Sequence, residues 1–257
     1  MMEALLGAIV LATYLLGVRA YASRYPHRRF GFWRIAAFCS GIVIAVGALL
    51  PPADTLVDAS FAAHMVQHLI FAFVVPPLLL LGAPLLLLVS LPAPRYGRAI
   101  ARFARHPALL FVISPVVAWL AFVAVLWGIH FSPLYEAALQ SPGIHIAEHA
   151  LLLSVALIFW MSVVQVGYSP HQVPFPVRIF YLFLAIPPGA FLGLAIYSSK
   201  HVLYAHYLAG RSFNAALVDQ QNAGAVMWIA GGALLFVAFM LTAVVWAARE
   251  RREEAIA

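Results

Sequence analysis

The chain has 257 residues, of which 65% are hydrophobic and only 9% are charged. A soluble domain is nearer half apolar and about a quarter charged, so this composition excludes an ordinary soluble protein and indicates a membrane protein. The formal net charge is +6. Cys39 is the one cysteine, so these residues can form neither an internal disulfide nor a cluster of thiolate metal ligands.

Seven apolar segments follow one another along the chain, at about 3–20, 33–50, 60–82, 108–129, 144–166, 177–198 and 222–247. Each is long enough to cross ~30 Å of hydrocarbon. Helices are expected because lipid offers no partner to open backbone groups. We therefore predict an all-α fold, a single seven-span transmembrane domain over residues 1–257. The first segment lacks a basic leader and a cleavage site, so we expect it to be a retained span.

The basic residues alternate between loops. Thirteen of the 15 lie in or beside the first, third and fifth loops or in the C-terminal tail, which share one side of the membrane in a seven-span chain. Only Lys200 and Arg211 fall on the other side. The positive-inside rule then predicts an external N-terminus and a cytoplasmic C-terminus. The basic charge is explained by topology, and we expect no nucleic-acid partner.

Prolines interrupt two of the segments. The third continues to residue 92, and we expect Pro76 and Pro77 to kink it and Gly82-Ala83-Pro84 to end it, leaving an interfacial stretch. The sixth carries Pro187-Pro188-Gly189 near its middle. Such a motif marks either a functional break or a kink that neighbouring helices satisfy, and we favour the kink.

Paired histidines open the third and fifth segments, as HMVQH (His64 and His68) and HIAEH (His145 and His149). Residues four apart on a helix lie on one face, ~6 Å apart, so each pair can chelate an ion. Ionisable groups inside spans are costly and mark functional sites that face the bundle interior. Both pairs start spans on the predicted outer side, so we expect them to converge on one metal or haem site.

The other histidines are expected to have lesser roles. His130, His201 and His206 are predicted to lie at the outer surface, and His27, His106 and His171 in or beside cytoplasmic loops. Imidazole suits copper, zinc and iron, and sulfur from Met65 or Met227 would favour Cu(I). Gln67 and Glu148 are candidates to fix imidazole tautomers.

A third motif, DQQNAGAVMW, opens the last segment between Asp219 and Trp228. We expect Asp219 to be the N-cap of this helix, an expectation that competes with a ligand role. Gly224 would let a neighbouring helix approach closely.

Taken in order, HMVQH with PPLLLLGAP, HIAEH with IFW, and DQQNAGAVMW resemble the CtaG family of cytochrome c oxidase assembly factors over about residues 60–247. The resemblance implies a seven-spanning, non-catalytic protein of the bacterial cell membrane that handles copper at the outer face. The partner it implies is a subunit of a haem-copper oxidase. The suspected metal positions are His64, His68, His145, His149, Asp219 and Met227. Many members carry a histidine in the motif that reads PPGAFLG here, so Gly189 would replace a family ligand.

Two alternatives remain from the residues themselves. HIAEH matches the HxxEH pattern in which two histidines bind zinc and a glutamate is the general base, so a membrane-embedded zinc hydrolase is the enzyme alternative. A haem held by histidines of two facing helices is the other. Besides the oxidase subunit, the expected partners are the lipid bilayer and a second copy of the chain.

Overall fold

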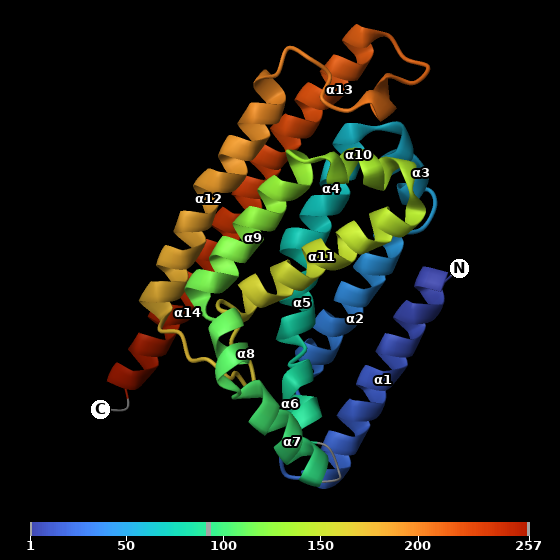
Figure 1. The fold of residues 1–257 in the computed structure, drawn as a ribbon. Coiled ribbons are helices and arrows are strands. Elements are labelled where there is room, and N and C mark those ends of the chain that lie inside the picture. The colour runs from blue at the N-terminus through green and yellow to red at the C-terminus, as the bar shows by residue number, and fades with distance from the viewer. Residues whose placement is uncertain (1, 91–93, 256–257) are drawn as a thin grey trace. The chain divides into compact units, whose positions relative to one another are not determined.

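A computed structural model describes residues 2–90 and 94–255, and every regular element in these residues is a helix (Figure 1). The predicted all-α fold is therefore confirmed. The chain forms two compact units, which are described here one at a time. The first comprises residues up to Thr55, Ile70–Ala118 and Ala156–Gln172, and the second comprises Leu56–Leu69, Trp119–Val155 and the chain from Val173 onward.

Among the residues that the structure describes, five helical stretches are long and apolar enough to cross a membrane: α1 (Met2–Arg24), Phe61–Val89, α11 (Pro142–Met161), α12 (Phe175–Ser198) and Phe213–Glu254. Two bent pairs can each supply one more span. They are α2 (Phe32–Ala48) with α3 (Ala53–Ala59), bent by 47°, and α9 (Pro115–His130) with α10 (Pro133–Gln140), bent by 65°. Counting them gives seven spans, the predicted number.

The core of the first unit forms around Tyr14 of α1. Its ring stacks on Phe38 of α2 with 3.8 Å between the centroids. Its hydroxyl donates a hydrogen bond to the carbonyl oxygen of Gly82 at 2.9 Å. The polar tip of a buried tyrosine needs such a partner, so Tyr14 fixes the end of α5 (Val75–Leu81) against the first two helices.

Two prolines change the helix type within the third apolar segment. A proline at position 76 cannot donate to the carbonyl of residue 72, and its ring crowds that carbonyl. The chain widens into a π-helix, η1 (Ile70–Val74), immediately before α5. The indole of Trp160 then donates to the Ala72 oxygen at 2.8 Å. Where we expected Pro76 and Pro77 to kink the segment, the structure shows a π-helical turn just before them.

The third apolar segment is interrupted at Gly82-Ala83-Pro84, as predicted. Gly82 caps α5, and Ala83 adopts a left-handed conformation with φ of 49° before α6 (Pro84–Val89) begins. The predicted continuation to residue 92 reaches beyond α6, and residues 91 and 92 lie outside the described part of the chain.

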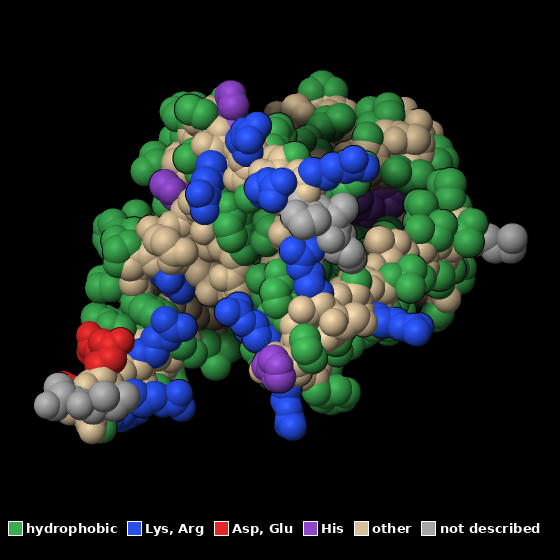
Figure 2. Space-filling model, turned by 90° about the horizontal axis from the view of Figure 1, so that it is seen from below, with side chains coloured by type: hydrophobic (Ala, Val, Ile, Leu, Met, Phe, Trp, Pro, Cys, Tyr) green, Lys and Arg blue, Asp and Glu red, His purple; other side chains and the backbone are tan. Residues whose placement is uncertain are grey.

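Arginines gather at one end of the first unit. Arg24, Arg28 and Arg29 lie at the turn between α1 and α2, and Arg95, Arg98 and Arg102 lie on α7 (Pro94–Ala104). Figure 1 places α7 beside that turn, and Figure 2 views this end, where blue side chains stand among hydrophobic ones. The sequence predicted that the arginines of the first and third loops lie on one side of the membrane, and in this unit they lie at one end.

The second unit contains α4 (Phe61–Leu69), most of α9, α10, much of α11, α12, η2 (Ala205–Leu208), α13 (Phe213–Ala225), η3 (Val226–Ala230) and α14 (Gly231–Glu254). In Figure 1, α12 runs beside α13 and α14, which follow each other in one line. The guanidinium groups of Arg178 and Arg249 both lie over the Phe175 ring, so the start of α12 meets the end of α14. Arg178 and Arg249 thus lie at the opposite end of α12 from α13, whereas Lys200 and Arg211 of this unit lie between α12 and α13.

Helix α12 continues through Pro187 and Pro188 without a break. The Trp127 indole donates to the Pro188 oxygen at 3.2 Å, so a neighbouring helix contacts the backbone where the prolines lie. The structure therefore shows no interruption of the helix at this motif, in keeping with the favoured interpretation.

The last helical stretch begins at Phe213, nine residues before the predicted start of the span. Ser212 is its N-cap, and the Ser212 hydroxyl accepts from the Ala215 amide at 3.2 Å. The prediction that Asp219 caps this helix is wrong, because Asp219 lies within α13. The polar run around Asp219 is tolerated there because its side chains bind other segments.

Helices α12 and α13 cross at two glycines. A Cβ atom added to Gly193 would lie 2.6 Å from the Gly224 oxygen and 2.6 Å from the Trp228 nitrogen. A Cβ atom on Gly224 would lie 2.5 Å from the Tyr197 nitrogen. The predicted close approach at Gly224 is confirmed, and Gly193 is its counterpart.

We expect Gly193→Ala to lower the thermal stability of the detergent-purified protein, since the new methyl group meets backbone atoms that cannot rotate away. Overpacking of this kind costs about 1–3 kcal/mol. Gly189→Ala is the matched control, because it lies one turn earlier on α12 with no atom within 4 Å of its added Cβ. Equal melting temperatures for the two variants would contradict the close crossing.

Candidate metal centre

Asp219 of α13 fixes the start of the histidine-bearing helix α4. One carboxylate oxygen accepts from the Ser60 hydroxyl at 2.7 Å and from the Ala62 amide at 3.4 Å, and the other accepts from the Phe61 amide at 2.9 Å. These are the open amides of a helix N-terminus, where a carboxylate is favoured. Asp219 therefore caps α4, a helix 158 residues away in the sequence.

Arg211 completes this contact. Its guanidinium donates to Asp219 at 3.1 Å and to the Ala59 oxygen at 3.1 Å. Asp219 was predicted as a metal ligand, and the structure places its two oxygens among four donors at the end of α4.

His64 and His68 lie on one face of α4, as their spacing predicted. Their ring centroids are 4.6 Å apart, and both side chains are fully buried. A polar group in such a position needs a partner to offset its lost hydration.

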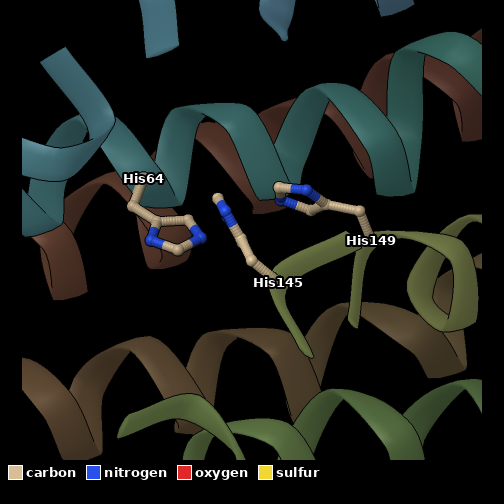
Figure 3. A group of neighbouring side chains, drawn as sticks. All are labelled: His64, His145 and His149. Atoms are coloured by element: carbon tan, nitrogen blue, oxygen red, sulfur yellow. The ribbon is translucent and has the colours of Figure 1, made fainter. Parts of the chain in front are cut away.

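His145 and His149 of α11 approach the same place from the second helix. Their rings are 4.3 Å apart, and the His145 ring lies 5.0 Å from that of His64. One ring nitrogen of each of His64, His145 and His149 lies within 4.8 Å of the others, close enough to hold one metal ion. Figure 3 shows the three rings side by side between the two helices. The two histidine pairs therefore lie together, as predicted, and their binding of one metal or haem stays a prediction.

A second group of side chains whose ligand atoms lie close enough to hold one metal ion consists of His64, His68 and Glu148. The Glu148 carboxylate is buried and lies 3.5 Å from His68 Nε2. Within residues 2–90 and 94–255, His64 Nε2, both His68 nitrogens and both Glu148 oxygens lack a hydrogen-bond partner. Buried polar atoms are rarely left unsatisfied, and a cation is one partner that would satisfy this set.

Two tyrosines hold the other side of the His64 ring. His64 Nδ1 lies 3.2 Å from the Tyr207 hydroxyl, which in turn lies 3.2 Å from the Tyr135 hydroxyl. Burial raises the pKa of Tyr207, so its hydroxyl keeps its proton at neutral pH. In the tautomer whose Nδ1–H donates to the Tyr207 hydroxyl, His64 Nε2 is a bare acceptor that can bind a metal.

The segment between α12 and α13 covers this centre. Gln220 accepts from the Leu203 amide at 2.7 Å and donates to the His201 oxygen at 3.0 Å, while Glu136 accepts from the His206 amide at 3.2 Å. Tyr204 and Tyr207 of this segment are buried against Phe61, with rings 5.0 Å and 5.3 Å from its ring. We call residues 199–212 the cap segment.

One sequence prediction is corrected here, and several residues were missed. His130 was expected at the surface, but it is buried, because the cap segment and Tyr135 cover the end of α9. The tyrosines at 135, 204 and 207 were not predicted at all. Their only signal is aromatic residues close to histidines in the predicted outer loops, namely Tyr204, His206 and Tyr207.

The predicted sulfur donors are both buried. Met65 lies next to His64 on α4, and Met227 lies in η3, which packs against α4. Gln67 is also buried on α4.

We expect Tyr207→Phe to weaken metal binding by about 10–100-fold, because His64 loses the hydroxyl contact that orients its ring. A competition titration with a chromophoric chelator would measure this. Tyr197→Phe is the control, since Tyr197 is exposed at the end of α12. An unchanged affinity in Tyr207→Phe would show that the hydroxyl does not support the ligand.

The model of the family described as cytochrome c oxidase caa3 assembly factor matches residues 12–249. The uncharacterized protein ML1998 of Mycobacterium leprae is 28% identical over 268 residues, which cover 97% of this chain and 40% of the relative. The uncharacterized protein Mb0105 of Mycobacterium bovis is 26% identical with the same coverage. The chain thus spans about 40% of the length of these curated relatives. No solved structure matches it.

Proposed function

Because the chain belongs to the cytochrome c oxidase caa3 assembly factor family, we propose that it binds copper through its buried histidines and passes it to a haem-copper oxidase. The observation that carries the proposal is the convergence of His64, His145 and His149 from two helices within the second unit. Membership of the family supports association with cytochrome c oxidase, and the three converging histidines could hold a metal ion.

The donor set favours copper among the metals that imidazole binds. Three neutral imidazoles with a thioether nearby suit Cu(I), because this ion accepts few ligands and prefers soft ones. A site without thiolates also releases its ion more readily than a cysteine cluster would. Such a site is suited to an ion that is cargo, delivered to an acceptor.

In this proposal the site faces the outer side of the membrane, and the charge distribution supports this orientation. Within the second unit, Arg178 and Arg249 lie at one end of α12, and the histidines lie near α13 at the other. The positive-inside rule puts the arginines in the cytoplasm, so the histidines face the periplasmic or extracellular side of a bacterial cell membrane. The acceptor subunit of the oxidase would receive the ion there.

A zinc hydrolase is the second candidate, and one observation favours it. The Glu148 carboxylate lies among the histidines, 3.5 Å from His68 Nε2, where a general base for a bound water would be needed. The site would then hold zinc with an open coordination position. Glu148→Gln would abolish hydrolysis in that case and leave the metal in place.

We expect His64→Ala/His145→Ala to remove one copper per chain from the protein loaded with Cu(I) under reducing conditions, because two of three converging ligands are lost. Elemental analysis of the detergent-purified protein measures this, and oxidase purified from the same cells should contain less copper. His201→Ala is the control, since His201 is exposed on the cap segment.

Three results would go against copper delivery. Zinc that resists exchange for copper would favour the hydrolase, and an absorption band of haem would favour the haem alternative. A full complement of copper in the double variant would remove the histidine cluster from the proposal.

A further inference from the structure

A buried histidine and a buried methionine face each other beside the histidine cluster. His130 is the last residue of α9, and its Nε2 atom lies 3.3 Å from the Met65 sulfur. Both side chains are buried, and both belong to the second unit. Neither residue belongs to the two groups of converging ligands described above.

The backbone decides which nitrogen of His130 carries the proton. Nδ1 lies 2.7 Å from the Leu126 carbonyl oxygen. A carbonyl oxygen only accepts, so Nδ1 must be the donor. In a neutral imidazole, Nε2 then has a lone pair and no hydrogen.

The contact between Nε2 and the Met65 sulfur therefore joins two acceptors. A thioether has no hydrogen to donate, so this pair is no hydrogen bond when His130 is neutral. A charged imidazolium would supply the missing hydrogen at the cost of a buried charge. The Glu148 carboxylate lies 3.5 Å from His68 Nε2, with no hydrogen bond between the two groups. A cation between the two lone pairs is the remaining way to satisfy both atoms.

The spacing fits two ligands of one ion. Metal–nitrogen and metal–sulfur bonds of about 2.0 Å and 2.3 Å with an angle of about 100–120° place nitrogen and sulfur roughly 3.3–3.7 Å apart. The observed 3.3 Å lies within this range. An imidazole with a thioether is a soft pair that selects Cu(I) over zinc.

The surroundings hold the pair in place. The Tyr204 hydroxyl donates to the His130 carbonyl oxygen at 2.8 Å, and the Tyr135 ring stacks on the His130 ring. The His68 ring lies 5.6 Å from that of His130, and its nitrogens lack hydrogen-bond partners among the described residues. His68 is therefore a neighbouring candidate for a third ligand.

We propose that His130 Nε2 and Met65 Sδ form a second metal position, selective for Cu(I), separate from the position of His64, His145 and His149. The inference rests on the proposed copper-binding function and deepens it. The chain then offers copper two positions of different softness, linked by the α4 histidines, and an ion can move from three imidazoles to a nitrogen–sulfur pair before it leaves.

The test is anaerobic Cu(I) binding to the full chain in detergent, with stoichiometry from chelator competition and ligands from copper X-ray absorption. The parent is expected to bind two Cu(I) per chain, with a sulfur shell near ~2.3 Å. Met65→Leu, which nearly conserves volume, should lose one copper and the sulfur shell. Met240→Leu is the matched control, because Met240 is exposed on α14.

Two further measurements keep the test decisive. His145→Ala/His149→Ala should retain one copper with its sulfur shell, and loss of all copper there would show that the two positions are not separate. Selenomethionine in the parent protein should replace the sulfur shell by a longer copper–selenium shell, without any substitution that affects folding.

The outcomes separate this inference from the proposed function. One Cu(I) in the parent with nitrogen ligands only would overturn the second position and leave the histidine site intact. An unchanged sulfur shell in Met65→Leu would also overturn it. A parent that binds no copper would overturn both.

Discussion

The carboxylate of Asp219 at the start of α4 is the contact on which the candidate site depends. A helix N-terminus presents open amides, and in an apolar environment these need a partner. Here Asp219 of α13 accepts from the Phe61 and Ala62 amides, while the Ser60 hydroxyl just before α4 accepts from the Ala63 amide at 3.3 Å. The contact therefore sets both the depth and the rotation of α4, and with them the direction in which His64 and His68 point.

Burial of neutral imidazoles is the second constraint. Each nitrogen removed from water loses hydration, so the second unit supplies a fixed partner for one nitrogen of a ring and leaves the other unmatched. Tyr207 does this for His64, and the Leu126 carbonyl does it for His130. Rings fixed in this way present lone pairs without further rearrangement, and so the cluster is suited to binding a cation.

The sequence predicted the features that depend on helical periodicity, namely the helices and the face that each histidine pair shares. The spacing of His64 with His68 and of His145 with His149 places each pair on one face, and the apolar segments around them indicate helices. It could not predict contacts made by irregular segments or between distant helices. Tyr207 lies in the cap segment, which has no period, and Asp219 binds a helix that no local pattern connects to it. His130 was misassigned because a histidine at a helix end resembles an interfacial residue until its neighbours are known.

The π-helical turn η3 has a consequence for how this family can tolerate length changes. A π-helical turn holds one more residue than an α-helical one, and one residue corresponds to about 100° of rotation along an α-helix. Removing one residue between Val226 and Ala230 would favour regular α-helix and turn α13 by about that angle relative to α14. Asp219 would then leave the amides of α4, although every side chain of the metal centre would still be present. A single-residue deletion outside the two histidine-bearing helices is thus a change of register for the whole centre.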